Sequence, residues 1–207
     1  MGTTSQADPQ FEFTGGAVCL DFANTLNGRK LSVLRDDLRS YSDLVAWARQ
    51  AGVLHPSDVR GLQSAAEHSS SRASSTLAKA RDLRETIYRV FSAIAAQKKP
   101  SAEDLEFIND VLVEALRHSR IVSRDGGFSR SWSEPRGNDL QSPLWPIAHS
   151  AAELLTSPDV HRVRECGSDS CAWLFVDQSK NRTRRWCDMK VCGNREKARR
   201  HYERARG

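Results

Sequence analysis

The sequence predicts an α+β protein with a predominantly α-helical body, a short β-hairpin and a small C-terminal module built around cysteines. Apolar residues recur at helical spacing in several segments before residue 157. Short alternating segments on both sides of Asp125-Gly126-Gly127 predict the hairpin. Four of the five cysteines fall between Cys166 and Cys192. We therefore expect two domains, residues 1–158 and 159–207.

The first elements of the body have weak patterns. Phe11 and Phe13 alternate with polar neighbours, which predicts a short strand. Residues 17–26 mix helical and alternating spacing, and we favour a helix there. The next helix has clearer signals, with Ser42 as the expected N-cap and Gly52 as the expected end.

The later helices of the body have stronger patterns. Pro56 is placed to begin a short helix, and the apolar stripe of residues 76–97 is typical of a long amphipathic one. The serine-rich segment 68–75 fits either a loop or the start of that long helix. Ser101 is expected to cap the following helix, and residues 142–156 are expected to form the last helix of the body.

Charge is distributed unevenly along the chain. Residues 160–207 hold thirteen Lys and Arg against six Asp and Glu, which leaves the first 159 residues with a net charge of −2. An acidic body with a basic end suggests that the end binds a polyanion. The sequence has no run of eighteen apolar residues and no secretory signal, so we expect no membrane span and a cytoplasmic location.

The cysteine spacing is C-x4-C-x15-C-x4-C, formed by Cys166, Cys171, Cys187 and Cys192. Two close pairs on tight turns are typical of a structural zinc site, and four thiolates leave no coordination position for a catalytic water. We therefore expect one structural zinc ion in a treble-clef-like module with the order knuckle, strand, turn, knuckle and helix. Incidental cysteines and a redox dithiol are the alternatives, the latter weakened by the absence of a C-x-x-C motif.

The basic residues of this module are candidates for binding nucleic-acid phosphates. Two alternatives stay open: the cations could form a solvated face, or they could neutralise the charge of a zinc tetrathiolate. Trp173 and Trp186 border the cysteines and are expected to pack over the zinc, with base stacking as the second possibility. The candidate phosphate-binding residues are Lys180, Arg182, Arg184, Arg185, Lys190, Arg195, Lys197, Arg199, Arg200 and Arg204.

The segment "RRWCDMKVCGNREKARRHYER" resembles the C-terminal signature of the CGNR zinc-finger family, with Cys192-Gly193-Asn194-Arg195 as the four residues that name it. The segments "CLDFANTL", "DLVAWARQAGVL", "LRETIYRVF" and "SPLWPIAHSAAELL" resemble the ABATE domain that precedes that finger. This resemblance implies zinc on the four clustered cysteines. It also implies a bacterial regulator of transcription that responds to stress.

The body offers no recognisable catalytic set, so we do not expect an enzyme. Asp21, Asn24 and Arg84 are polar residues within apolar runs and could line a ligand pocket, although capping and buried ion pairs are the commoner roles. The leading hypothesis is a DNA-binding regulator whose body senses a small-molecule effector or forms a homodimer. The alternatives are a protein-interaction module that uses the basic finger, and a small-molecule-binding protein in which zinc is architectural.

Overall fold

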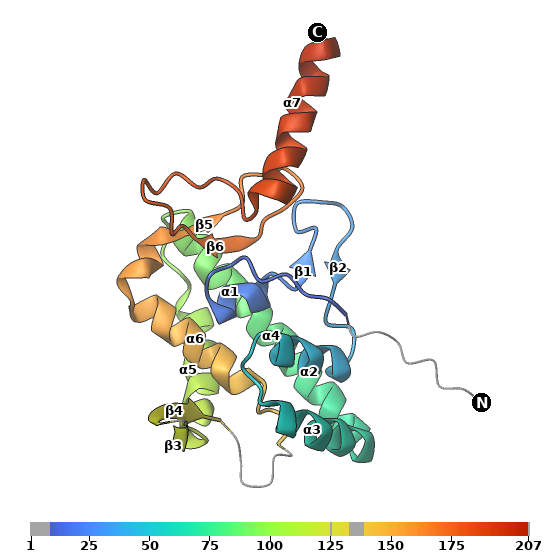
Figure 1. The fold of residues 1–207 in the computed structure, drawn as a ribbon, viewed down its shortest axis with the longest axis vertical. Coiled ribbons are helices and arrows are strands. Elements are labelled where there is room, and N and C mark those ends of the chain that lie inside the picture. The colour runs from blue at the N-terminus through green and yellow to red at the C-terminus, as the bar shows by residue number, and fades with distance from the viewer. Residues whose placement is uncertain (1–8, 125, 133–138, 207) are drawn as a thin grey trace, which may run out of the picture.

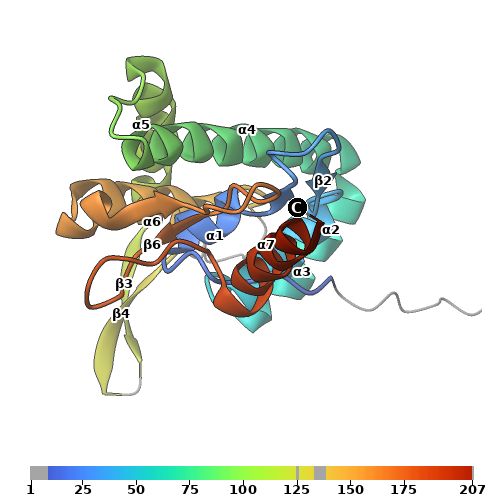
Figure 2. The ribbon, with the colours of Figure 1, turned by 90° about the horizontal axis from the view of Figure 1, so that it is seen from above.

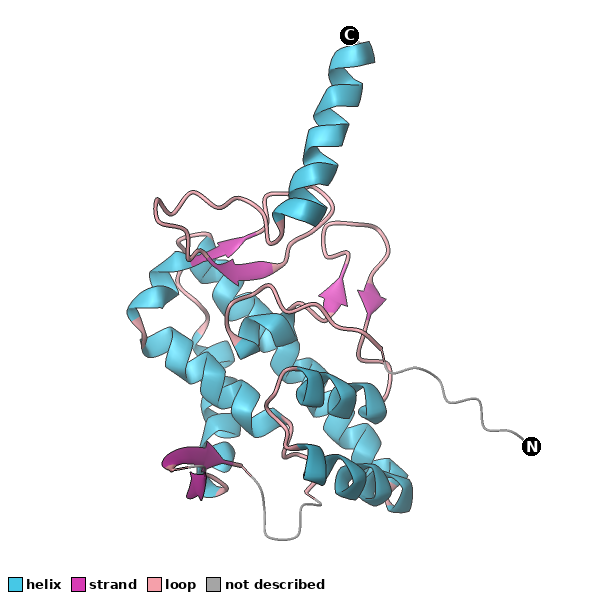
Figure 3. Ribbon diagram, viewed as in Figure 1, coloured by secondary structure: helices cyan, strands magenta, loops and turns pink. Residues whose placement is uncertain are grey.

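The structure is a computed structural model, and it describes residues 9–124, 126–132 and 139–206. Helices dominate the body, and the strands are short antiparallel pairs (Figure 3). No described helix has the length and apolar character needed to cross a membrane. The α-helices are α1 (Val18–Ala23), α2 (Tyr41–Gln50), α3 (Pro56–His68), α4 (Ser70–Ala95), α5 (Ala102–Arg117), α6 (Leu144–Thr156) and α7 (Asn194–Arg206).

The strands form three separate pairs. The predicted hairpin is confirmed in register, with Arg120 opposite Ser131, while its turn residue Asp125 lies outside the described residues. In the other two pairs only one strand was predicted, the one between the knuckles, which the structure has at Leu174–Val176. The remaining strands have two or three residues and are too short to show a period of two. The pairs are β1 (Leu26–Asn27) with β2 (Arg35–Asp36), β3 (Arg120–Arg124) with β4 (Gly127–Ser131), and β5 (Val163–Glu165) with β6 (Leu174–Val176).

The short helix α1 lies at the centre of the body, between α4 and α6 (Figure 1). Leu20 and Phe22 of α1 are fully buried. So are Leu44 and Trp47 of α2 and Leu83 and Ile87 of α4. Burial of this size is the main term that stabilises a domain of this length. The central position of α1 also places its polar residues next to the C-terminal module.

Several local predictions for the body need correction. The N-cap of α2 is Ser40 and not Ser42, because Ser40 and Asp43 form a reciprocal capping box. Phe11 and Phe13 lie in extended chain without a strand partner among the described residues. The serine-rich segment is helical: α4 begins at Ser70, where the burial of Ala73 and Leu77 outweighs the weak helix propensity of serine.

The C-terminal module is joined to the body through the β5–β6 hairpin. Val163, Leu174 and Val176 belong to the same apolar core as the helices. The side chain of Asn24 on α1 pairs with the backbone of Leu174, accepting its N–H at 2.8 Å and donating to its carbonyl at 2.9 Å. The hairpin is therefore part of the body core, although it lies beyond the expected domain boundary at residue 158.

Helix α7 has a different environment from every other helix. It extends away from the rest of the molecule, with the C-terminus at its far end (Figure 1), and it is seen nearly end-on from above (Figure 2). Among its residues only Glu196 is buried. The packing that stabilises α7 is thus confined to its first turn.

Candidate metal centre

The four predicted cysteines converge on one point. Their sulfur atoms all lie within 4.8 Å of one another, with 3.8 Å between Cys171 and Cys187 and 3.6 Å between Cys187 and Cys192. A tetrahedron with Zn–S bonds of about 2.3 Å has sulfur–sulfur edges of about 3.8 Å. Three of the cysteines are buried and Cys171 is half-buried. The cluster therefore fits one structural zinc ion, bound by Cys166, Cys171, Cys187 and Cys192.

Backbone hydrogen bonds hold the two knuckles together and point N–H groups at the sulfurs. Trp173 donates its N–H to Cys171 Sγ at 3.4 Å, and Cys187 donates to Cys166 Sγ at 3.5 Å. The N–H of Gly167 donates to the carbonyl of Arg185 at 2.8 Å, which joins the first knuckle to the chain before the second. A Cβ at residue 167 would lie 3.1 Å from that carbonyl oxygen, so the close approach favours glycine.

Without a cation the four thiols cannot all be ionised. Hydrogen bonds from Cys171 and Cys187 lower the pKa of the Cys166 thiol, and the hydrogen bond to Cys166 raises the pKa of Cys187. Burial together with the charges of Cys171 and Cys166 raises the pKa of Cys192 to about 12. Binding of a divalent cation supplies the positive charge that lets all four thiolates exist at neutral pH.

An apolar layer covers the cluster. Phe175 is buried beside the cysteines, and Trp173 and Trp186 pack against them, which confirms the predicted packing role of both tryptophans. The guanidinium of Arg184 stacks over the Phe175 ring at 4.4 Å and donates hydrogen bonds to the carbonyls of Trp186 and Cys187. Arg184 is therefore part of the module's structure, and we leave it out of the proposed phosphate contacts.

Glu196 connects α7 to the first knuckle. Its carboxylate accepts hydrogen bonds from the Ser168 hydroxyl at 2.9 Å and from the Asp169 N–H at 3.3 Å, and it pairs with Arg199 at 3.0 Å. The bonds from Ser168 and then Arg199 lower the pKa of this carboxyl group. Spacing along the helix predicts a pair with Arg200 instead. From the sequence, Glu196 is only a charged residue three positions after Gly193, and no neighbouring residue indicates that its side chain is buried.

The predicted phosphate-binding residues divide into two groups. Arg199 contacts three carboxylates, those of Asp169, Glu196 and Glu203, so its charge is already compensated. Arg195 donates to the Ser170 hydroxyl at 2.8 Å. The exposed cations that have no ion pair within the described part of the chain are Lys180, Arg182, Arg185, Lys190, Lys197, Arg200 and Arg204.

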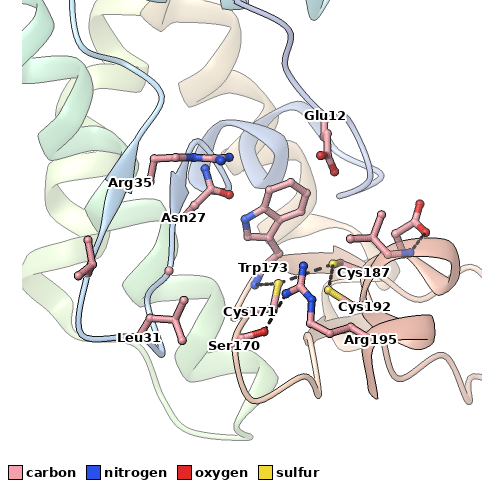
Figure 4. Close-up of a pocket in the computed structure, with 14 residues that line it drawn as sticks. Glu12, Asn27, Leu31, Arg35, Ser170, Cys171, Trp173, Cys187, Cys192 and Arg195 are labelled. Atoms are coloured by element: carbon pink, nitrogen blue, oxygen red, sulfur yellow. Dashed lines mark hydrogen bonds between the residues drawn. The ribbon is translucent and has the colours of Figure 1, made fainter. Parts of the chain in front are cut away.

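A cleft of about 360 Å³ adjoins the cysteines (Figure 4). The loop between β1 and β2, with Leu31 and Val33, forms one wall, and the two knuckles form the other. Trp173 lies between these walls, and Arg195 of α7 extends over the cleft next to Ser170. The sulfurs of three of the four cysteines belong to the same wall, so a molecule in this cleft would contact the metal site and the first turn of α7 together.

Comparison with known protein families agrees with this geometry. A family model described as "ABATE: Putative stress-induced transcription regulator" matches residues 16–158. The chain belongs to the ABATE family. A second model, the CGNR zinc finger, matches residues 162–205 and contains all four cysteines. Neither description is that of an enzyme, and no match to the chain was found among the curated proteins.

The predicted pocket residues of the ABATE part form contacts within the fold. Asp21 and Asn24 border a cavity of only about 30 Å³, room for roughly one water molecule. The Asp21 carboxylate accepts the Gly15 N–H at 2.7 Å, and burial raises its pKa to about 6. Arg84 is not among the residues that line this cavity, although it donates to Thr25, which does, at 3.5 Å. Arg84 also forms a bidentate ion pair with Asp36 at 2.6 and 2.9 Å. These contacts give all three polar residues a structural role, and a ligand pocket shared by them stays a prediction.

Proposed function

We propose that this ABATE protein is a DNA-binding regulator of transcription in the cytoplasm, and that the zinc ion orients the basic helix α7 toward nucleic-acid phosphates. The observation that carries the proposal is the exposure of α7. An isolated helix of thirteen residues is marginally stable in water, and this one has no apolar face to pack. A polyanion on its surface would stabilise the helix and neutralise its cations.

The arrangement of acidic residues supports the same proposal. Glu196 and Asp169 compensate the charge of Arg199 near the base of the helix. Lys197, Arg200 and Arg204 of α7 are exposed and have no acidic partner among the described residues. Arg199 is therefore compensated by carboxylates at the base of α7, and the other exposed cations of the helix are left for a partner.

The test is a salt titration of binding to a fluorescently labelled 30-bp duplex, followed by anisotropy. The slope of log K against log salt is about −0.9 for each phosphate contact. Replacing Lys197, Arg200 and Arg204 with glutamine should weaken binding and reduce the magnitude of the slope by about 2 to 3.

The matched control removes three cations from the body, at Arg60, Arg72 and Arg117. It changes the net charge equally and should leave the slope close to that of the unmodified protein. Equal slopes for the two triple variants would show that net charge alone governs binding and would contradict the proposal. Capture of an acidic protein that survives nuclease treatment, with no duplex binding, would favour the protein-interaction alternative.

A second function is favoured by the cleft between the β1–β2 loop and the knuckles. Its volume of about 360 Å³ is within the range of small-molecule sites, and it combines Trp173, Leu31 and Val33 with the guanidinium of Arg195. We propose that a small-molecule effector binds there, and this is the sensing role that the body would contribute. The cleft favours sensing over dimerisation because it adjoins both the metal site and α7.

This proposal predicts a bound compound that native mass spectrometry of the purified protein detects as a mass adduct. Replacing Leu31 and Val33 with aspartate should remove the adduct, because both side chains line the cleft. The control is Leu34→Asp, since Leu34 is also exposed on this loop but does not line the cleft. An adduct that survives the double substitution would place the compound elsewhere, and absence of any adduct at all would count against an effector held tightly in this site.

A further inference from the structure

The charged residues of α7 are sorted by helix face. At about 100° per residue, Arg195, Arg199 and Arg206 fall within a sector of about 40° on one side of the helix. Lys197, Arg200 and Arg204 fall within a sector of about 60°, centred roughly 150° away. The helix thus carries two separate rows of cations along nearly opposite sides.

The two faces between these rows differ in composition. One contains the acidic residues Glu196 and Glu203, and Glu196 directs this face toward the first knuckle. The other contains no charged group and faces away from that contact. It consists of Asn194, Ala198, His201, Tyr202 and Ala205.

We propose that α7 lies in the major groove of duplex DNA, with the neutral face toward the base edges; this rests on the proposed DNA-binding function. Lys197, Arg200 and Arg204 would face one phosphate backbone, and Arg195 and Arg206 the other, while Arg199 stays paired with its carboxylates. Two cation rows flanking a neutral face match a groove that has phosphates on both walls. The major groove is about 12 Å wide and admits a helix, whereas the minor groove is about 6 Å wide.

The neutral face has the chemistry needed to distinguish base pairs. Asn194 and His201 carry hydrogen-bonding groups, and asparagine can pair with both major-groove atoms of adenine. Tyr202 is 69% exposed and lies at the edge of this face, beside the His201 ring. Ala198 and Ala205 have small side chains that allow close approach of the helix to the bases. Asn194, His201 and Tyr202 are thus the residues that set sequence preference.

The zinc module determines how far the helix can enter. Glu196 fixes the first turn to the knuckle, and α7 then continues for about 15 Å beyond it, at 1.5 Å per residue. That length reaches across the major groove. The body, which has a net negative charge, lies at the opposite end of the helix axis from the C-terminus (Figure 1).

The experiment selects duplexes from a library with a random 20-bp core, and then measures affinity for a selected and a scrambled duplex. The double variant N194A/H201A should lose on the order of tenfold or more of the preference for the selected duplex. Its affinity for the scrambled duplex and its salt slope should stay unchanged, because no cation is removed. Both residues are exposed and alanine favours helix, so the variant should fold.

Two further measurements separate the possible failures. E203Q, on the acidic face, is the control and should keep the preference. Dimethyl sulfate footprinting should find protection at guanine N7, which lies in the major groove, and protection only at adenine N3 would overturn the placement. Duplex binding with no sequence preference, or a preference that survives N194A/H201A, overturns this inference and leaves the proposed function standing. Failure to bind any duplex overturns both.

Discussion

Removal of zinc is expected to unfold the knuckles and α7 while the helical body and the β5–β6 hairpin stay folded. Structural zinc contributes an apparent binding free energy of roughly 10–16 kcal/mol in small finger modules at neutral pH. The apolar cluster around the cysteines contains one large fully buried side chain, Phe175, and cannot replace this contribution. Loss of the metal also leaves four clustered thiols that cannot all be ionised and that no longer share a common ligand.

Hydrogen bonds that do not involve the metal determine which part of the chain we expect to stay folded after zinc is removed. The amide of Leu174 is bonded to Asn24, that of Val176 to the carbonyl of Gly15, and that of Asp177 to the carbonyl of Arg162. The first two bonds join the hairpin to the body, the third closes the hairpin itself, and none of them depends on the sulfurs. Glu196, in contrast, is bonded to Ser168 and Asp169 within the first knuckle, so α7 loses its support when that knuckle opens.

Hydrogen exchange followed by mass spectrometry, with and without a chelator, measures this limit. Amides in residues 166–171 and 187–206 should exchange much faster after chelation, and those of residues 163–165 and 174–177 should keep their protection. Metal analysis should find about one zinc per chain, and about none in a Cys187→Ser variant. Cys19→Ala is the control, since Cys19 is buried outside the cluster. Protection of α7 that survives complete removal of zinc would refute this account.

The metal site could be predicted from sequence because its determinants are local. The turn residues between Cys166 and Cys171 and the spacing of the second pair specify two knuckles without any knowledge of the body. Glu196 could not be predicted in the same way. A carboxylate at this position can pair with a cation one turn along the helix or with the knuckle, and the direction of α7 relative to the metal decides between them.

Residue type alone also does not distinguish the arginines that stabilise the fold from those whose side chains are exposed. Arg184 and Arg185 are neighbours in the same basic cluster, yet Arg184 stacks on Phe175 and bonds to backbone carbonyls, while Arg185 is exposed. The partner that distinguishes them lies in β6, and only the folded hairpin brings it close. Arg84 illustrates the same limit in the body, because its partner Asp36 is 48 residues away along the chain.

Among the charged side chains of the body, loss of the Arg84 guanidinium is expected to destabilise the fold strongly. The residue is 3% exposed, donates two hydrogen bonds to Asp36 and a third to Glu85 at 3.0 Å. It holds β2 against α4, and Arg29 of the adjoining loop pairs with the same Glu85. Without Arg84, Asp36 keeps only Arg81 as an ion-pair partner, at 3.4 Å, and Glu85 keeps Arg29. Loss of the buried hydrogen bonds to these two carboxylates should cost about 1.5–3 kcal/mol.

The measurement is urea unfolding of zinc-loaded Arg84→Ala at pH 7, compared with Arg117→Ala. Arg117 also pairs with a carboxylate, Glu114, but its side chain is 71% exposed, so its removal should cost at most about 1 kcal/mol. Similar midpoints for the two variants would show that the Arg84 network does not stabilise the fold.

The loss of unfolding free energy caused by Arg84→Ala should also depend on pH. The direction of the pKa shifts determines whether this loss increases or decreases as pH falls. Burial opposes ionisation of Asp36 and Glu85, but the hydrogen bonds from Arg84 and Arg29 outweigh it and lower the pKa of both carboxyl groups. A folded-state pKa below the unfolded value contributes stability that is present above the unfolded pKa and is lost as pH falls through the folded pKa. The difference in unfolding free energy between the unmodified protein and Arg84→Ala should therefore be largest near neutral pH and should decrease below about pH 4. A difference that stays constant from pH 7 to pH 3 would mean that packing of the arginine side chain, and not its charge, holds β2 to α4.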